Sequence, residues 1–119
     1  MDKMKLILYS PHQTNAIMLL DRTCHTVYCN GQCIVISATE FSLLWALAEK
    51  SRKIVSREDL LQCAWGYNAI GKTRTVDVHI QRLRKKIGAL YIETVYKKGY
   101  MRILCIIRES EANSHRIRR

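Results

Sequence analysis

The chain holds 119 residues, of which 48% are hydrophobic and 25% charged, with a formal net charge of +10. This composition excludes a disordered chain, and without a signal peptide or an apolar run near the roughly 20 residues that span a bilayer, we expect one cytoplasmic domain with no membrane partner. Residues 1–66 carry seven basic and six acidic side chains whereas residues 67–119 carry thirteen and four, and this asymmetry favours nucleic acid as a ligand over a generally basic surface.

The first third of the chain predicts four short strands joined by turns. Turn residues separate four apolar runs, as in an antiparallel meander, and these runs are KLILY, AIMLL, HTVYC and QCIVI. The dipeptide Asn30-Gly31 is typical of a two-residue hairpin turn. This turn predicts two cross-strand pairs, Cys29 with Gln32 and Tyr28 with Cys33.

The five cysteines are not expected to form disulfides or a metal site. Side chains alternate along a strand, so Cys29 and Cys33 face opposite sides of the predicted sheet. Cys24 shares a face with Cys33 but lies about 13 Å away along the neighbouring strand. We therefore predict reduced thiols, no metal and no cofactor.

A helical period begins after these strands. Ser37 and Glu40 form a capping box, which predicts a helix over about residues 38–50. Ser56 caps a second helix, and Gly66 ends it. Both helices carry apolar residues at the spacing of a buried face.

A third helix is expected over residues 73–87, before Gly88. Placing successive residues 100° apart around the helix gives an apolar stripe that must face the core, formed by Val76, Ile80, Leu83 and Ile87. The other side is cationic. Asp77 and Arg84 lie close in angle two turns apart and are expected to be structural, with Arg84 paired to a carboxylate.

The cationic face of this helix fits a DNA major groove, with a solvated helix exterior as the alternative. Arginine reads guanine edges there, so Arg82 is expected to read a base. Val78 either meets a thymine methyl group or is exposed by chance. His79 has no second ligand at metal-binding spacing and is expected to contact a phosphate. Further backbone contacts are expected from Lys72, Arg74, Gln81, Lys85 and Lys86.

A β-hairpin is predicted after the third helix. The stretches YIETVY and YMRILCII flank its tip, where Lys97 and Lys98 lie between Tyr96 and Tyr100. A basic hairpin beside a basic helix is typical of a wing that lies over the adjacent backbone or minor groove. The domain is therefore expected to span residues 1–108, followed by a flexible basic tail over residues 109–119.

The stretch GYNAIGKT has the spelling of a P-loop, with Gly66, Gly71, Lys72 and Thr73 at its defining positions. A working P-loop joins a β-strand to a helix beside a parallel sheet. The preceding SREDLLQCAW is helical by its cap and its period, so the stretch is interpreted as a turn. We expect no enzymatic activity.

Four motifs occur in order along the chain, namely EF-x-LL, SRE-x-LL, VDVHI-x-RLRKK and TV-x-x-x-GY. Together they resemble the effector domain of OmpR/PhoB-type response regulators over nearly the whole chain. The resemblance implies an α+β winged helix-turn-helix with an N-terminal four-stranded antiparallel sheet, three helices and a C-terminal β-hairpin wing. It also implies promoter DNA and RNA polymerase as partners, a homodimer on tandem half-sites, and a receiver domain N-terminal in the full protein.

The resemblance implies roles for single residues as well. Thr75, Val78 and Arg82 fall where the family's recognition helix meets bases. Trp65, Arg74 and His79 correspond to backbone contacts, and Thr94 marks where wing contacts begin. The loop that touches RNA polymerase corresponds to Gly66, Tyr67, Asn68, Ala69, Ile70, Gly71 and Lys72.

Three positions depart from the family pattern. Tyr96 and Lys97 stand where the family has Arg-Gly in the wing, so the charge of Lys97 and Lys98 would have to replace that arginine. Gln81 stands where a basic residue is frequent. A protein-interaction or RNA-binding winged helix is the alternative function, and a nucleotide-binding P-loop is a more distant one.

Overall fold

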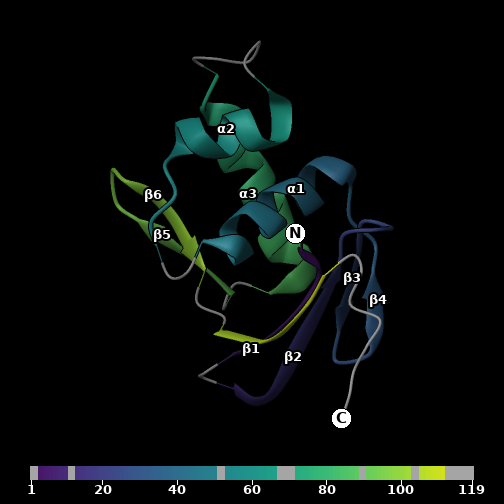
Figure 1. Ribbon diagram of the computed structural model, residues 1–119. Helices are drawn as coiled ribbons and strands as arrows, with labels where there is room; N and C mark the ends of the chain where they lie inside the picture. Colours follow the sequence, from purple (N-terminus) through teal and green to yellow (C-terminus); the bar gives the residue numbers. More distant parts are fainter. Residues whose placement is uncertain are drawn as a thin grey trace.

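The computed structural model describes residues 3–10, 13–50, 53–66, 72–88, 91–102 and 105–111. These residues contain seven strands and three helices. In chain order (Figure 1) the elements are β1 (Lys3–Ser10), β2 (Gln13–Asp21), β3 (Thr26–Cys29), β4 (Gln32–Ile34), α1 (Ala38–Glu49), α2 (Arg57–Trp65), α3 (Arg74–Ile87), β5 (Ile92–Val95), β6 (Gly99–Arg102) and β7 (Cys105–Glu111). Strands, then helices, then a hairpin confirm the predicted α+β class.

The N-terminal strands form an antiparallel sheet, as predicted. Among the described strands the order is β4-β3-β2-β1-β7. Both predicted pairs across the hairpin turn are present, Cys29 with Gln32 and Tyr28 with Cys33. The two turn residues, Asn30 and Gly31, have φ of 53° and 83°, the left-handed values that a type I′ turn requires.

Strand β7 corrects two predictions. The stretch YMRILCII was expected to be one strand of the hairpin, but β6 ends at Arg102 and β7 pairs with β1 of the larger sheet. This pairing satisfies backbone amides and carbonyls that β1 would otherwise present at a free edge. Because β7 runs to Glu111, residues 109–111 belong to a strand rather than to the predicted tail, and residues 112–119 lie outside the described residues.

The helices begin and end where local signals predicted. Ser37 and Glu40 form the expected capping box at the start of α1. The hydroxyl of Ser56 accepts a hydrogen bond from the amide of Asp59 at the start of α2. Gly66 follows α2, and its amide donates to Gln62 in the last turn.

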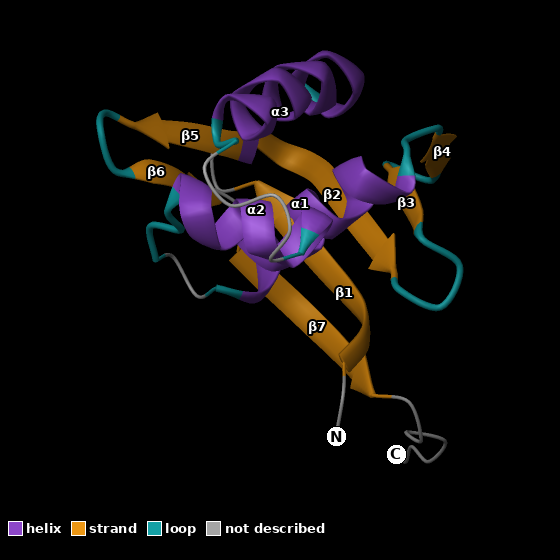
Figure 2. Cartoon of the chain, turned by 90° about the horizontal axis from the view of Figure 1, so that it is seen from above, coloured by secondary structure: helices purple, strands orange, loops and turns teal. Residues whose placement is uncertain are grey.

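Helix α1 is the centre of the core. It lies between the larger sheet and α2 (Figure 1), and eight of its twelve residues are buried. The core-facing side of the sheet contributes Leu6, Leu8, Met18, Leu20 and Val27. Helix α3 crosses the same core, which leaves its opposite face to solvent, and Figure 2 shows the β5–β6 hairpin beside it.

Candidate DNA-binding surface

Helix α3 presents one apolar and one polar face, as its period predicted. Val76, Ile80 and Leu83 are fully buried, and Ile87 is nearly so. The opposite side is solvent-accessible, with Arg74, Val78, Gln81, Arg82 and Lys85 exposed and with Thr75 and His79 half-buried. The structure therefore places these predicted contact residues on one accessible face.

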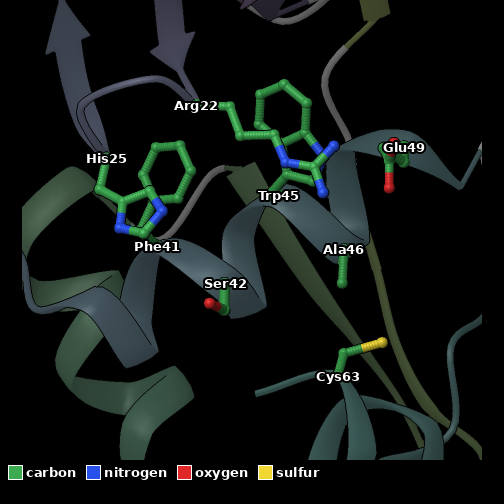
Figure 3. Close-up of a pocket in the computed structure, with 8 residues that line it drawn as sticks. All are labelled: Arg22, His25, Phe41, Ser42, Trp45, Ala46, Glu49 and Cys63. Atoms are coloured by element: carbon green, nitrogen blue, oxygen red, sulfur yellow. The ribbon is translucent and has the colours of Figure 1, made fainter. Parts of the chain in front are cut away.

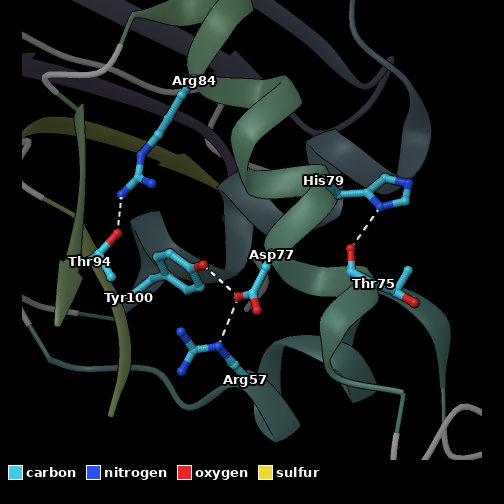
Figure 4. Close-up of polar contacts among 7 residues, drawn as sticks. All are labelled: Arg57, Thr75, Asp77, His79, Arg84, Thr94 and Tyr100. Atoms are coloured by element: carbon cyan, nitrogen blue, oxygen red, sulfur yellow. Dashed lines mark hydrogen bonds and ion pairs between the residues drawn. The ribbon is translucent and has the colours of Figure 1, made fainter. Parts of the chain in front are cut away.

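Three of the predicted contact residues form a small cluster where α2 meets the start of α3. The Nδ1 atom of His79 lies 2.9 Å from the carbonyl oxygen of Thr75, one turn earlier (Figure 4). A carbonyl oxygen can only accept, so Nδ1 carries the hydrogen. The edge of the His79 ring packs against Trp65, with ring centroids 4.9 Å apart. These contacts orient His79 and leave its Nε2 atom as the free polar position of the ring.

A second cluster lies where α2, α3 and β6 meet. We call it the Tyr100 cluster, and it consists of Arg57, Asp77, Arg84 and Tyr100 (Figure 4). Oδ1 of Asp77 accepts two hydrogen bonds, one from Nε of Arg57 at 2.8 Å and one from the hydroxyl of Tyr100 at 2.6 Å. The guanidinium carbons of Arg57 and Arg84 lie 5.3 Å and 5.5 Å from the centroid of the Tyr100 ring. Each is within the range of a cation–π interaction.

The electrostatics of the cluster follow from burial and from this pairing. Burial, and then the hydrogen bond to Asp77, raise the pKa of Tyr100 above its usual value. The hydrogen bond to Asp77 is also the main reason that the pKa of Arg57 is raised. Tyr100 therefore stays protonated and Arg57 stays charged at neutral pH.

The prediction that Arg84 pairs with a carboxylate is wrong. Nη2 of Arg84 donates to the carbonyl oxygen of Ile92 at 2.9 Å and to Oγ1 of Thr94 at 2.7 Å, rather than to a carboxylate. Arg84 lies seven positions after Asp77, which is about 10 Å along a helix axis, and the Asp77 oxygen already accepts from two other donors. Arg84 thus has the structural role predicted for it, but it joins α3 to the hairpin.

A short backbone pairing holds the hairpin from the other side. The amide of Val55 donates to the carbonyl of Tyr100 at 2.8 Å, and the amide of Tyr100 donates back at 3.0 Å. The approach requires glycine at the preceding position, because a Cβ atom on Gly99 would lie 2.1 Å from the Val55 oxygen and φ there is 142°. Sequence reasoning did not identify Val55, because the GY dipeptide marks only the hairpin side of this long-range pairing.

The tip of the hairpin is exposed and basic. Tyr96 is 81% exposed, and Nζ of Lys97 lies 5.5 Å from the centre of its ring. Lys98 and Thr94 are also exposed. Tyr100, in contrast, is only 3% exposed, so the two tyrosines that flank the tip differ in environment.

Lys86 forms an ion pair with a buried carboxylate of α1. Its Nζ atom lies 2.8 Å from Oε1 of Glu40, which also accepts from the amide of Ser37. Burial raises the pKa of Glu40, but the hydrogen bonds from Lys86 and Ser37 outweigh burial and lower it overall. The Lys86 ammonium group therefore joins α3 to the capping box of α1.

The loop with the P-loop spelling is only partly described. Residues 67–71 lie outside the described residues, and Gly66 and the exposed Lys72 border them. The segment before the loop is helix α2, as the sequence predicted, rather than the β-strand that a P-loop follows.

A pocket of about 290 Å³ lies between the β2–β3 turn, α1 and α2 (Figure 3). The ring of His25 stacks on Phe41, which stacks on Trp45, and the guanidinium carbon of Arg22 lies 5.4 Å from the centroid of the Trp45 ring. None of the described residues predicted to contact DNA lines this pocket. It is separate from the surface formed by α3 and the hairpin.

Within the described part of the chain, three helices followed by a β-hairpin packed beside the third helix define a winged helix. Residues 31–102 match the family described as "Transcriptional regulatory protein, C terminal". The chain belongs to this family, the C-terminal effector domains of OmpR/PhoB-type response regulators. None of the described helices has the length and apolar character to cross a membrane.

Similar proteins agree with this assignment. The transcriptional regulatory protein VxrB of Vibrio cholerae is 41% identical over 83 residues, which are 70% of this chain and 34% of VxrB. The chain thus spans about a third of the length of such relatives. The DNA-binding domain of Bacillus subtilis CssR is 35% identical with a TM-score of 0.66, over 71% of this chain and 98% of CssR. The Klebsiella pneumoniae RstA DNA-binding domain, solved in complex with the RstA box, is 34% identical with a TM-score of 0.62, over 71% and 89% of the two chains.

Proposed function

We propose that this chain binds double-stranded promoter DNA in a sequence-specific manner and thereby regulates transcription. The recognition helix over residues 73–87 enters the major groove, and the wing over residues 94–100 lies on the adjacent backbone or minor groove. The observation that carries the proposal is that α3 turns a cationic face to solvent beside a basic hairpin to which Arg84 joins it. The RstA domain solved with its DNA box has the same fold, which supports the docking mode.

Residues on the exposed face of α3 divide between bases and backbone in this proposal. Base contacts come from Thr75, Val78 and Arg82, which lie on the solvent-accessible side of the helix. Backbone contacts come from Trp65, Lys72, Arg74, His79, Gln81 and Lys85. Lys86 is omitted from this set because its ammonium group is held by Glu40.

The wing supplies the remaining contacts. Lys97 and Lys98 provide positive charge at the exposed tip, where the family has an arginine. Thr94 accepts a hydrogen bond from Arg84 through Oγ1, so its own hydroxyl hydrogen can be donated to a phosphate. Tyr96 is exposed beside Lys97 and can pack against the sugar–phosphate backbone.

Selection of bound sequences from a random duplex pool tests the function directly. We expect an enriched direct repeat of half-sites about one helical turn apart, because we propose that two copies bind in tandem as a homodimer. Enrichment of a single half-site would refute tandem assembly but keep specific recognition. Recovery of no preferred sequence, or preference for RNA over duplex DNA, would refute the function.

Salt dependence tests the electrostatic part of the same proposal. Neutralised phosphates release counterions, so the logarithm of the affinity should fall linearly with the logarithm of salt concentration. A flat salt titration would indicate a protein partner instead.

RNA polymerase and a receiver domain complete the proposal. A receiver domain N-terminal in the full protein is consistent with a match to a C-terminal family and with relatives of which the matched segment covers about a third. The loop over residues 66–72 is proposed to contact RNA polymerase. Substitutions at Tyr67 and Asn68 should then reduce activated transcription and leave promoter binding intact, and loss of both activities together would contradict this division.

A further inference from the structure

The β5–β6 hairpin depends on other elements for its orientation. Among the described strands, β5 and β6 form a two-stranded sheet of their own, which is not joined to the larger sheet. An isolated two-stranded hairpin is at best marginally stable in water. Contacts with the helices and with the α1–α2 connection must therefore determine where the wing lies.

Several of those contacts involve Tyr100. Its backbone pairs with Val55, its hydroxyl donates to Asp77 of α3, and its ring lies between the guanidinium groups of Arg57 and Arg84. The negative π faces of the ring attract both guanidinium groups, whose carbons lie 5.3 Å and 5.5 Å from its centroid. At 3% exposure, Tyr100 is inside this cluster and outside the surface proposed to meet DNA.

The cluster continues to the wing through Arg84. Its guanidinium group donates to the backbone of Ile92 and to the hydroxyl of Thr94, both on β5. A hydroxyl that accepts from a charged group is polarised and becomes a better donor. The hydroxyl of Thr94 is thus held in place and strengthened by a residue on α3.

We propose that Tyr100 and Arg84 are positioning residues for DNA binding, which hold the wing at one distance from α3 so that both reach the same stretch of duplex. The inference rests on the proposed function, because it concerns how the wing contributes to that binding. Their contribution to affinity passes through Thr94, Lys97 and Lys98 and requires no contact between Tyr100 and DNA.

Tyr100→Phe is the most informative variant because it removes one hydroxyl, retains the ring and changes no charge. We expect about fivefold weaker binding to the cognate duplex, which corresponds to a loss of binding free energy of the order of 1 kcal/mol. The slope of log affinity against log salt should also become shallower, since a displaced wing neutralises fewer phosphates. A purely structural role would not change that slope in protein that remains folded.

Double-mutant cycles identify the part of the surface through which Tyr100 acts. The effect of Lys97→Ala should shrink in the Tyr100→Phe background, because the wing has already lost its phosphate contact. The effect of Arg74→Ala, at the other end of α3, should be unchanged. Tyr28→Phe is the matched control, because this tyrosine lies on β3 of the larger sheet and the wing belongs to the other sheet.

Each result separates the inference from the function on which it rests. All binding is measured at a temperature where circular dichroism shows every variant folded. Arg84→Lys serves as a second variant, because it keeps the positive charge but loses the planar guanidinium group that donates to Ile92 and Thr94. Additive effects of Tyr100→Phe and Lys97→Ala, or an unchanged salt slope in Tyr100→Phe, would overturn the positioning role. Failure of the wild-type chain to bind any selected duplex would instead overturn the proposed function.

Discussion

Two adjacent lysines on α3 provide a test of how far the structure separates stability from DNA binding. Lys85 is exposed, whereas Nζ of Lys86 lies 2.8 Å from Oε1 of Glu40. The perturbation is Lys86→Ala, with Lys85→Ala as the control. The two variants share the same change in charge, helix propensity and side-chain length.

The expected loss for Lys86→Ala follows from the environment of Glu40. The Glu40 side chain is 3% exposed, so removing its cation leaves a buried carboxylate with fewer donors. The Lys86 side chain is 40% exposed, and the amide of Ser37 still donates to Glu40, so the cost lies well below that of a fully buried pair. We expect Lys86→Ala to lower the free energy of unfolding by about 1–2 kcal/mol. Lys85→Ala should change it by less than about 0.5 kcal/mol.

The stability lost in Lys86→Ala should also depend on pH, in a direction set by the pKa of Glu40. Glu40 has a pKa below its ordinary value of 4.5 in the folded state. A lowered folded pKa contributes stability that is present above the unfolded value and is lost as pH falls through the folded value. The difference in stability between wild type and Lys86→Ala should therefore be complete near neutral pH and should shrink below about pH 4.5 as Glu40 is protonated.

Urea denaturation across this pH range, followed by circular dichroism, measures both effects. DNA titrations at several salt concentrations should give the reverse order of the two variants, with Lys85→Ala lowering the salt slope by about 1 and Lys86→Ala leaving it near the wild-type value. Equal stability of the two variants at neutral pH would refute the assigned ion pair. A larger change in salt slope for Lys86→Ala than for Lys85→Ala would indicate that Lys86 contacts a DNA phosphate.

Three further substitutions test the base contacts and the wing. Arg82→Ala should cost about 1–3 kcal/mol of binding free energy on the cognate duplex and relax base preference at one position, as measured by competition with single-base variants. Val78→Ala should weaken preference for thymine at a neighbouring position in the same assay, if its exposed methyl groups meet a thymine. Gly99→Ala should lower the free energy of unfolding by about 2 kcal/mol or more, because the new Cβ would overlap the Val55 oxygen.

Controls for these substitutions are available in the same chain. Equal losses of Arg82→Ala on cognate and scrambled duplexes would remove Arg82 from the base contacts. An unchanged preference in Val78→Ala would mean that Val78 is exposed by chance. Gly31→Ala is the control for Gly99→Ala, since φ at Gly31 is 83° but a Cβ there meets no atom within 4 Å, and equal destabilisation of the two would show that strain alone accounts for the effect.

Local features of this protein could be predicted from the amino-acid sequence. Capping at Ser37 and Ser56, the turn at Asn30-Gly31 and the apolar stripe of α3 each depend on groups a few residues apart, so their patterns could be interpreted without the fold. The order of four motifs was enough to indicate the family, which the match to residues 31–102 confirms. The boundaries of the helices followed from the same short-range hydrogen bonds.

Contacts between distant parts of the chain depend on tertiary packing and could not be predicted from the sequence. The hydroxyl of Tyr100 reaches Asp77 across 23 positions, and Lys86 reaches Glu40 across 46. The apolar run after Arg102 suited a strand of either sheet, and β1 of the larger sheet became its partner. The residue type of an α3 side chain and its angle around the helix do not determine whether it contacts DNA, a carboxylate or the wing. Its role depends on which atoms the packed chain brings within hydrogen-bond distance, and sequence spacing does not encode that distance.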